Sequence, residues 1–199
     1  MEILKLFQYS EKMKFSDIEK ALKVRSNKLA YHLKNLTKKG ILSREGNYYK
    51  LSESSEYSVP YLSEKESFLP VVLILIGDTK KVFLHKRNKR PYKNMLSLPG
   101  GRILLGESLE LASKRIMKEK FNIDIKFKKL NSISFEQVKK SNKIIHSFIL
   151  FLVSVMTKNK IEFSNVIENK SKIIPSDYKL ITEDFNKETK IQTIFSKTK

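Results

Sequence analysis

Cysteine is absent from the 199 residues of this chain, and histidine occurs only three times. Without cysteine there is no disulfide framework, no thiolate zinc site and no thiol nucleophile. The histidines, His32, His85 and His146, are too dispersed to indicate a metal site. Long apolar runs are also missing, since the longest, residues 146–156, is too short to cross a bilayer. The charged N-terminal residues do not read as a signal peptide, so we expect a cytoplasmic protein without membrane contact.

Acidic residues are scarce: 21 Asp and Glu stand against 40 Lys and Arg, which gives a formal net charge of +19. The imbalance is strongest between Lys20 and Lys50, where nine basic residues accompany a single acid, Glu45. A segment this basic is typical of a surface that binds a polyanion. Because the whole chain is rich in lysine, the local concentration of charge indicates a partner more strongly than the total does.

Basic residues disappear between positions 51 and 64, a segment with five serines, three glutamates and Pro60. This change of composition predicts a linker at residues 54–66. It would join an N-terminal domain, residues 1–53, to a C-terminal domain, residues 67–199. Both predicted domains have ordinary sizes for independent folding.

The N-terminal domain shows the periodicity of three helices. Two are predicted over Ile3–Tyr9 and Phe15–Leu22, and a third begins at Ser26 and ends before Gly40. The inward stripe of the third helix consists of Leu29, Leu33 and Leu36. Its opposite face carries groups that contact phosphates and base edges, namely Asn27, Lys28, Tyr31, Lys34, Asn35 and Lys38.

A hairpin is predicted after these helices, with Ile41–Arg44 and Tyr48–Leu51 on either side of a turn at Gly46. Three helices and a hairpin resemble the winged helix-turn-helix of small prokaryotic repressors. The resemblance implies duplex DNA as a partner, a homodimer that reads two half-sites, and Arg44 as a further DNA-contacting residue on the wing. A small helical module for protein contact or dimerisation is the alternative interpretation.

The C-terminal domain is predicted to be an α/β domain. Strand-like apolar segments occupy Val71–Ile76, Val82–His85 and His146–Met156, and weak alternation of apolar and polar residues predicts another strand over Ile123–Val138. A short helix is predicted from Pro175 to about Phe185, with Ser176 or Asp177 as its cap.

Between these strands lies the segment Leu98–Ile123, LPGGRILLGESLELASKRIMKEKFNI. It resembles the Nudix box, G-x5-E-x7-R-E-U-x-E-E-x-G-U, in which U is an aliphatic residue. The positions that fit are Gly101, Glu107, Arg115, Met117, Glu119 and Ile123. Three positions depart from the pattern, because Ile116 and Lys120 replace glutamates and Asn122 replaces glycine. The resemblance covers about residues 68–187 and implies a Nudix α/β/α sandwich with a mixed sheet.

The departures concern the residues that hold metal in this pattern. Glutamates at positions 116, 119 and 120 would share one helix face, since residues three and four apart are neighbours. Such a cluster suits Mg²⁺ or Mn²⁺, which activates water at a diphosphate. Here Glu119 remains, with Glu107 and Glu136 as further carboxylates. We predict a weak metal site at Glu119, catalytic candidates at Glu119 and Glu107, and hydrolysis that is impaired or absent. An ordinary solvated helix face is the alternative interpretation of Glu119 and Lys120.

The rest of the box implies a ligand cleft. Gly100 and Gly101 permit a tight turn whose backbone approaches a ligand. The resemblance implies a structural ion pair between Arg115 and Glu107. Lys120 would lie where the family places metal and could bind a diphosphate in its stead, as guanidinium groups also do. The predicted ligand-binding set is Arg87, Gly100, Gly101, Arg102 and Lys120.

Two functions from different classes follow. In the first, the chain is a DNA-binding transcription regulator whose degenerate Nudix domain senses a nucleotide or nucleotide-sugar ligand. The superfamily includes proteins fused to winged helices that respond to ADP-ribose-type ligands. In the second, it is a Nudix hydrolase that cleaves a nucleoside diphosphate linked to another group, with Mg²⁺ or Mn²⁺ as cofactor. The two lost carboxylates favour the first function, and the retained box residues keep the second open. A purely structural degenerate domain is a third interpretation.

Overall fold

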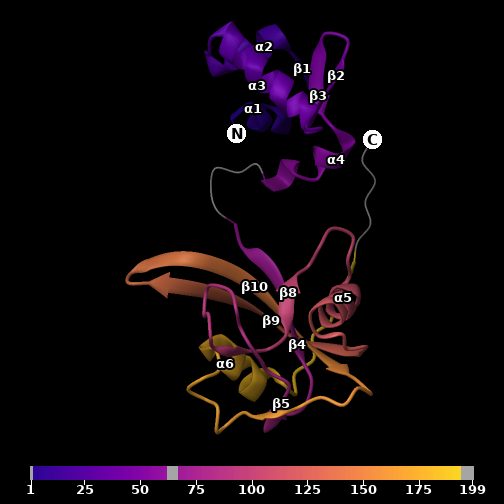
Figure 1. Ribbon diagram of the computed structural model, residues 1–199, viewed down its shortest axis with the longest axis vertical. Helices are drawn as coiled ribbons and strands as arrows, with labels where there is room; N and C mark the ends of the chain where they lie inside the picture. The colour runs from indigo at the N-terminus through magenta and orange to yellow at the C-terminus, as the bar shows by residue number, and fades with distance from the viewer. Residues whose placement is uncertain (1, 62–66, 194–199) are drawn as a thin grey trace. The chain divides into compact units, whose positions relative to one another are not determined.

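The computed structural model describes residues 2–61 and 67–193, and the chain divides into two compact units, residues 1–66 and 67–199. Figure 1 shows the elements of each unit. Each unit has hydrophobic core residues of its own. In the part of the chain that the structure describes, no helix combines the length and apolar character needed to cross a membrane.

Unit 1 combines short helices with a small antiparallel sheet. Its elements, with η for a 3-10 helix, are α1 (Glu2–Lys5), η1 (Leu6–Gln8), β1 (Lys12–Lys14), α2 (Phe15–Leu22), α3 (Ser26–Lys38), β2 (Leu42–Glu45), β3 (Tyr48–Leu51), α4 (Glu53–Glu56) and η2 (Val59–Tyr61). The strands lie in the order β1-β3-β2. Side chains from the helices and the hairpin together form the core, which contains Phe7, Ile18, Leu29, Leu33, Leu42 and Leu51.

Two residues in the left-handed backbone region end the main helices of unit 1. Lys23, at φ +52°, ends α2, and its N–H donates to Glu19 O at 2.9 Å. Gly40, at φ +69°, follows α3, as expected for a glycine just beyond a helix C-terminus. Ser52 Oγ donates to Gly40 O and holds the far end of the hairpin against this turn.

Three features of unit 1 differ from the sequence-based expectation. The first predicted helix is divided into α1 and η1. Residues 12–14 form strand β1 because they pair with β3, and three residues are too few to show a strand period. Residues 53–61, which the composition assigned largely to a linker, form α4 and η2. Gln8 Nε2 donates to Val59 O at 3.2 Å, so this segment packs against η1 as part of unit 1.

Unit 2 is built on a four-stranded mixed sheet. Its elements are β4 (Leu69–Leu75), β5 (Lys81–Val82), β6 (His85–Lys86), β7 (Leu96–Ser97), β8 (Gly100–Arg102), α5 (Leu109–Phe121), β9 (Lys126–Lys140), β10 (Lys143–Met156), β11 (Ser164–Asn165) and α6 (Pro175–Asp184). The sheet order is β8-β4-β10-β9, in which β4 and β10 are parallel and the other neighbours are antiparallel. Two short ladders, β6 with β7 and β5 with β11, lie outside this sheet.

Helices pack on both faces of the sheet, as Figure 1 shows. Met117 of α5 shares a core with Val72 of β4, whereas Leu180 of α6 shares a second core with Leu73. Successive β4 residues supply the two cores because side chains alternate across a strand. The prediction of a mixed α/β fold with a mixed sheet is confirmed for this unit.

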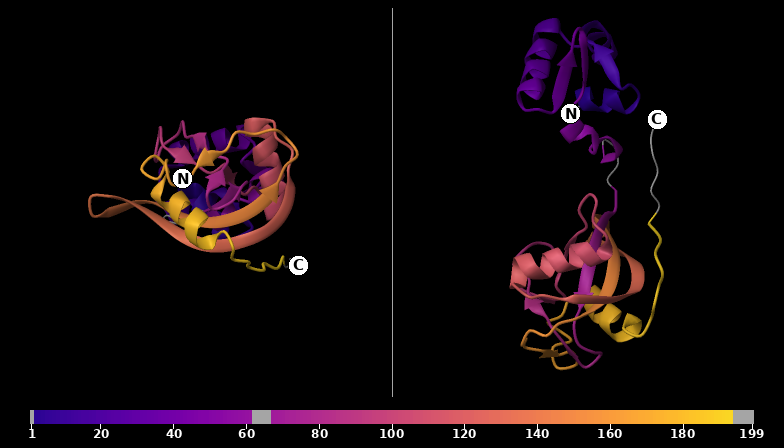
Figure 2. Two further views of the ribbon diagram at one scale, coloured as in Figure 1. Left: turned by 90° about the horizontal axis from the view of Figure 1, so that it is seen from below. Right: turned by 90° about the vertical axis from the view of Figure 1, so that its right-hand side faces the viewer.

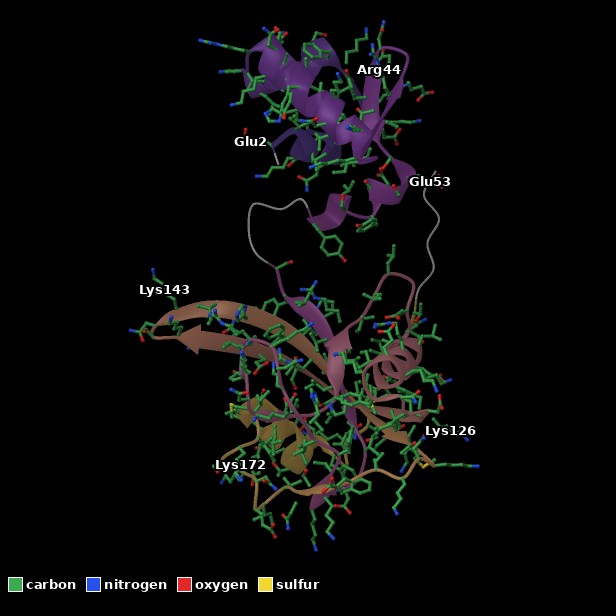
Figure 3. All side chains as sticks on the ribbon, viewed as in Figure 1. Glu2, Arg44, Glu53, Lys126, Lys143 and Lys172 are labelled. Atoms are coloured by element: carbon green, nitrogen blue, oxygen red, sulfur yellow. The ribbon has the colours of Figure 1, made fainter. Side chains whose placement is uncertain are left out.

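The β9–β10 hairpin extends beyond the rest of unit 2 (Figures 1 and 2). Figure 3 shows Lys143, the first residue of β10, near the tip of this hairpin. Phe135 is 73% exposed along it, and its ring centroid lies 5.0 Å from that of Phe68. The ladder continues to Lys140 and Lys143, beyond the apolar segments that predicted it, because backbone pairing does not require apolar side chains.

Candidate ligand-binding site

The two glycines of the box turn are required by close packing around β8. A β-carbon on Gly100 would lie 2.8 Å from Leu73 Cδ2 and from a backbone oxygen of β4, closer than non-bonded atoms approach. A β-carbon on Gly101 would lie 3.0 Å from Ile116 Cδ1 and 3.5 Å from Lys120 Nζ. Gly101 therefore faces α5, and Gly100 faces the other side of the sheet.

Both ends of α5 are capped. Ser108 is the N-cap, and its Oγ accepts a hydrogen bond from Leu111 N–H at 3.2 Å. Asn122 is the C-cap at φ +54°, and its N–H donates to Lys118 O at 3.0 Å. Asparagine adopts the left-handed conformation more readily than other non-glycine residues. The replacement of the box glycine by Asn122 therefore preserves the helix end.

An ion pair joins the loop before α5 to the middle of the helix. Arg115 donates from Nε and Nη2 to the two carboxylate oxygens of Glu107, the second at 2.8 Å. Leu104 N–H donates to Glu107 Oε2 at 2.8 Å, and Arg115 Nη2 donates to Arg102 O at 3.0 Å. The Arg115 hydrogen bond is the largest cause that holds the pKa of Glu107 below its usual value. Because both oxygens of Glu107 are engaged, this geometry favours a structural role for it.

The three positions at which the Nudix pattern carries metal-binding glutamates have different surroundings. Ile116 is 0% exposed and lies in the core between α5 and the sheet. The Glu119 side chain is 61% exposed, and its Oε2 lies 3.4 Å from Arg115 Nη1. Lys120 donates from Nζ to Gly100 O. Position 116 therefore belongs to the core, which helical spacing alone did not predict.

These residues do not fit the divalent cation that the pattern implies. Mg²⁺ and Mn²⁺ take several oxygen ligands. Residues 2–61 and 67–193 contain no group of three or more His, Asp or Glu side chains that would hold a metal. Glu136 pairs with Phe148 in the β9–β10 ladder and shares the α6 side of the sheet with it, away from Glu119. Glu119 and Glu107 both lie against the Arg115 guanidinium, which counters their charge, and the residue after Glu119 is the ammonium-bearing Lys120.

A small pocket of about 70 Å³, with largely apolar walls and a few polar side chains, lies on the α6 side of the sheet. Tyr92 Oη donates to Glu136 Oε1 at 3.3 Å in this pocket. Burial and the adjacent Glu136 carboxylate raise the pKa of Tyr92 to about 12. Ser176 Oγ is buried and has no hydrogen-bond partner among the described residues. The pocket therefore offers polar groups that a ligand would satisfy.

Asp177 is the buried acid of this pocket. Its Oδ2 accepts a hydrogen bond from Leu98 N–H at 2.8 Å. Burial raises the pKa of Asp177 to about 7, a shift that the Leu98 hydrogen bond opposes and Glu136 reinforces. The prediction that Ser176 or Asp177 caps α6 is wrong, because Pro175 occupies the start of the helix and the N-cap is Ile174.

Arg87 lies between this pocket and the box helix. Its Nε donates to Pro91 O at 2.7 Å and to Lys89 O at 3.0 Å, so the loop is wrapped around the guanidinium group. The same side chain lines the pocket. Partial burial lowers the pKa of Lys120, and repulsion by Lys89 and then Arg87 lowers it further. These three cations are therefore close enough to influence one another.

Arg102 does not join these cations. It lies opposite Val71 in the β4–β8 ladder and shares a sheet face with Gly100, because alternate residues point the same way. Gly101, between them, faces Lys120 from the other side. The neighbourhood of Arg102 and Lys120 that the box implied is not formed, and the contribution of Arg102 here is its carbonyl oxygen, bonded to Arg115.

The pocket residues Tyr92, Ser176 and Asp177 were not in the predicted site. They were missed because they come from two segments far apart in sequence. In addition, the residues Pro175–Asp177 indicated only the start of a helix. A larger cavity of about 720 Å³ lies at the end of β10, beside residues 157–163. Neither this cavity nor the smaller pocket is lined by a box residue. The smaller pocket remains the candidate ligand site because Arg87 of the predicted site and the buried Asp177 line it.

A separate candidate interface lies on α3 of unit 1. One exposed stripe at helical spacing consists of Asn27, Tyr31, Lys34 and Lys38. The Tyr31 ring is 64% exposed and is therefore available for contact with a partner. Lys28 and Asn35 line a groove with α1 instead, and Asn35 is half-buried. The exposed stripe therefore contains four of the six residues that were predicted for this face of α3.

Cations and aromatic rings also meet on the sheet of unit 1. The Lys12 and Lys14 ammonium groups lie 5.1 and 5.4 Å from the Tyr48 ring centroid. Arg44, labelled on the hairpin in Figure 3, lies 5.8 Å from the Tyr49 ring. Lys12 and Lys14 were missed because their strand was not predicted.

Comparison with known proteins identifies the C-terminal unit. A sequence model of the NUDIX domain family matches residues 67–170, just over half of the chain. The chain therefore belongs to the NUDIX domain family. No curated protein matches it.

Solved structures similar to this chain include three with NUDIX folds. A NUDIX-family hydrolase from Clostridium perfringens is 18% identical, with 61% of this chain and 98% of that chain covered and a TM-score of 0.46. The MutT protein from Bacillus halodurans is 20% identical, with 61% and 84% covered and a TM-score of 0.48. The NUDIX domain of Shewanella oneidensis NrtR, complexed with ADP ribose, is 16% identical, with 66% and 95% covered and a TM-score of 0.46.

Proposed function

We propose that this chain is a DNA-binding transcription regulator whose NUDIX domain senses a nucleotide or nucleotide-sugar ligand and hydrolyses it poorly or not at all. The observation that carries this proposal is the burial of Ile116 in the core, with Lys120 bonded to Gly100 O beside it. A domain that keeps its ligand cleft but lacks the carboxylates for metal binds its ligand without consuming it. That behaviour suits a sensor.

The arrangement of unit 1 supports DNA binding. Helices α2 and α3 are joined by three residues, and the β2–β3 hairpin follows, which is the element order of a winged helix-turn-helix. The exposed stripe of α3 would enter the major groove, where Asn27 and Tyr31 reach bases and Lys34 and Lys38 reach phosphates. The hairpin cations would contact the backbone. A homodimer would read two half-sites roughly 34 to 36 Å apart.

The pocket of unit 2 supports a nucleotide ligand. At about 70 Å³ the pocket does not enclose a nucleobase, but Ser176 and Asp177 present a hydroxyl and a carboxyl group that can exchange hydrogen bonds with one polar edge of such a ring. Arg87 lies at the edge of this pocket and suits a phosphate. A base and a diphosphate could therefore be held by neighbouring groups of one domain.

Titration of fluorescent duplexes tests the proposal. Genomic fragments from the source organism would be titrated with the full chain, with and without ADP-ribose, at several salt concentrations. We expect salt-dependent binding, preference for some fragments, and an affinity that changes with ADP-ribose. The effect must be reciprocal if it is allosteric. Binding without any sequence preference or salt dependence would leave unit 1 as a protein-contact module.

The second candidate is a NUDIX hydrolase with a weakened metal site. The exposed Glu119 carboxylate next to Arg115 is the observation that favours it. In this alternative, Mg²⁺ or Mn²⁺ would support cleavage, and unit 1 would tether the enzyme to nucleic acid or to another subunit. Turnover measurements with metal distinguish the two functions.

A further inference from the structure

We infer that the Lys120 ammonium takes the place of the divalent cation, and that Lys120, Arg87 and Lys89 bind the diphosphate group of a nucleotide directly, without metal. The inference rests on the proposed function, because it concerns how the same domain holds its ligand. It differs from that proposal in specifying metal-free binding.

The position of Lys120 supports this role. Its Nζ lies over the box turn, bonded to Gly100 O and 3.5 Å from the point that a β-carbon on Gly101 would occupy. An ammonium group has three donors, so two remain after the bond to Gly100. Glycine at position 101 places no side chain beside this ammonium. A positive charge is thereby fixed at the turn where the family's diphosphate chemistry takes place.

The charges around Lys120 indicate the charge of the ligand that would bind there. Lys89, Arg87 and Arg115 repel Lys120, and Glu119 is the acid that counters this repulsion. The Arg87 guanidinium is held in place by Pro91 O and Lys89 O, so it is pre-organised. Arg115 is paired with Glu107, so Lys120, Arg87 and Lys89 remain against the exposed carboxylate of Glu119. This leaves a net positive site, which an anion with two charges would neutralise. A diphosphate matches this charge and spans more than one cation.

Substitution of lysine for a metal separates binding from hydrolysis. A bound metal both neutralises phosphate charge and activates water. An ammonium group supplies the first effect alone, as a point charge with hydrogen-bond donors. The ligand would consequently stay intact while bound, and its affinity would depend on salt but not on free Mg²⁺.

Isothermal titration calorimetry on the full chain tests this inference with two probes, ADP and inorganic pyrophosphate. Each probe would be titrated in EDTA and in Mg²⁺. We expect binding in EDTA that Mg²⁺ does not strengthen and that weakens as salt rises. Lys120→Met should weaken both probes about tenfold or more in EDTA, since it removes the charge at the turn. Lys118→Met is the matched control on the same helix, because Lys118 is exposed and paired with Asp124; we expect little change.

The outcomes separate the inference from the proposed function. Binding that EDTA abolishes, or a Lys120→Met variant that behaves like Lys118→Met, overturns the metal-free site and leaves a nucleotide sensor. Absence of binding to ADP, pyrophosphate and ADP-ribose under both conditions overturns the sensor as well. Thermal unfolding checks that each variant is folded. If Lys120→Met is not, Lys120→Gln keeps a donor for Gly100 O without the charge and should show the same loss.

Discussion

The carboxylate of Asp177 accepts a 2.8 Å hydrogen bond from the N–H of Leu98, 79 positions earlier in the chain. This bond ties the start of α6 to the turn that carries Gly100 and Gly101. Because burial raises the pKa of Asp177 to about 7, the carboxyl group is protonated in the folded chain over a wide acidic range. The two parts of the candidate site are therefore joined through a group that titrates near neutral pH.

Asp177 should make the unfolding free energy pH-dependent. Its pKa is 3.8 in its ordinary state and about 7 when folded, so the folded chain binds the extra proton between these values. Protonation of Asp177 therefore stabilises the folded chain. This stabilisation is fully present below about pH 4 and is lost as pH rises through 7, where the unfolding free energy falls by at most about 1.4 kcal/mol per pH unit. Asp177→Asn keeps an acceptor for Leu98 and removes the titration.

Urea unfolding followed by circular dichroism at pH 5, 6, 7 and 8 measures this difference. The stability of Asp177→Asn relative to the unsubstituted chain should rise across the series. His85, whose pKa is lowered by burial, titrates in both proteins and cancels in the comparison. Parallel curves for the two proteins would show that Asp177 is ionised throughout.

Ile116→Glu should destabilise unit 2 rather than rebuild a metal site. The substitution removes a fully buried isoleucine and places a carboxyl group against Gly101 in the core. We expect a loss of about 3 kcal/mol or more, compared with about 1 kcal/mol for the control Ile116→Val. The double variant Ile116→Glu with Lys120→Glu should not recover this loss in Mg²⁺. A stable double variant that binds Mg²⁺ and turns over ADP-ribose would contradict the assignment of position 116 to the core.

Hydrolysis of ADP-ribose, NAD and nucleoside triphosphates should be very slow even with millimolar Mg²⁺. Glu119 and Glu107 are both paired with Arg115, and Leu104 N–H also engages Glu107. Chromatographic product analysis measures the rate, and Glu119→Gln tests any residual activity for dependence on this carboxylate. Steady turnover of about 1 per second or faster, lost in Glu119→Gln, would identify a working hydrolase.

Substitutions on α3 should divide into two classes. Lys34→Ala and Lys38→Ala should weaken all DNA sequences similarly and reduce the salt dependence, since phosphate contacts carry no sequence information. Asn27→Ala should instead reduce discrimination between sequences by about 1 to 3 kcal/mol per lost base contact. Lys39→Ala is the control, because Lys39 lines the groove with α1 rather than the exposed stripe. Equal effects of all four variants would argue against this helix as the recognition element.

Much of the fold could be predicted because local sequence dominates it. The bounds of α2 match the predicted Phe15–Leu22, and α3 begins at the predicted Ser26. These segments have apolar residues at helical spacing and clear end signals. Strand β1 could not be predicted in the same way, since its three residues become a strand only through pairing with β3. For segments this short, pairing with another strand determines whether a strand forms.

The candidate site was less predictable, because its geometry depends on register and burial. The box pattern placed Ile116, Glu119 and Lys120 on one helix face, yet the packing of α5 on the sheet buries the first and exposes the second. The face of Arg102 depends on its register with Val71, which no local pattern specifies. The Tyr92 and Asp177 pocket joins segments some 85 residues apart along the chain, and its acid resembled a helix cap.

The burial of Ile116 also limits which single substitutions this domain can accept at that position. A glutamate that returned at position 116 would meet Gly101 and the apolar neighbours of the core before any metal could compensate for its charge. Natural domains have only about 5–15 kcal/mol of stability, so such a step consumes a large part of it. A glutamate at position 116 therefore requires coordinated changes in the surrounding core, because a single substitution would leave its carboxylate among apolar side chains.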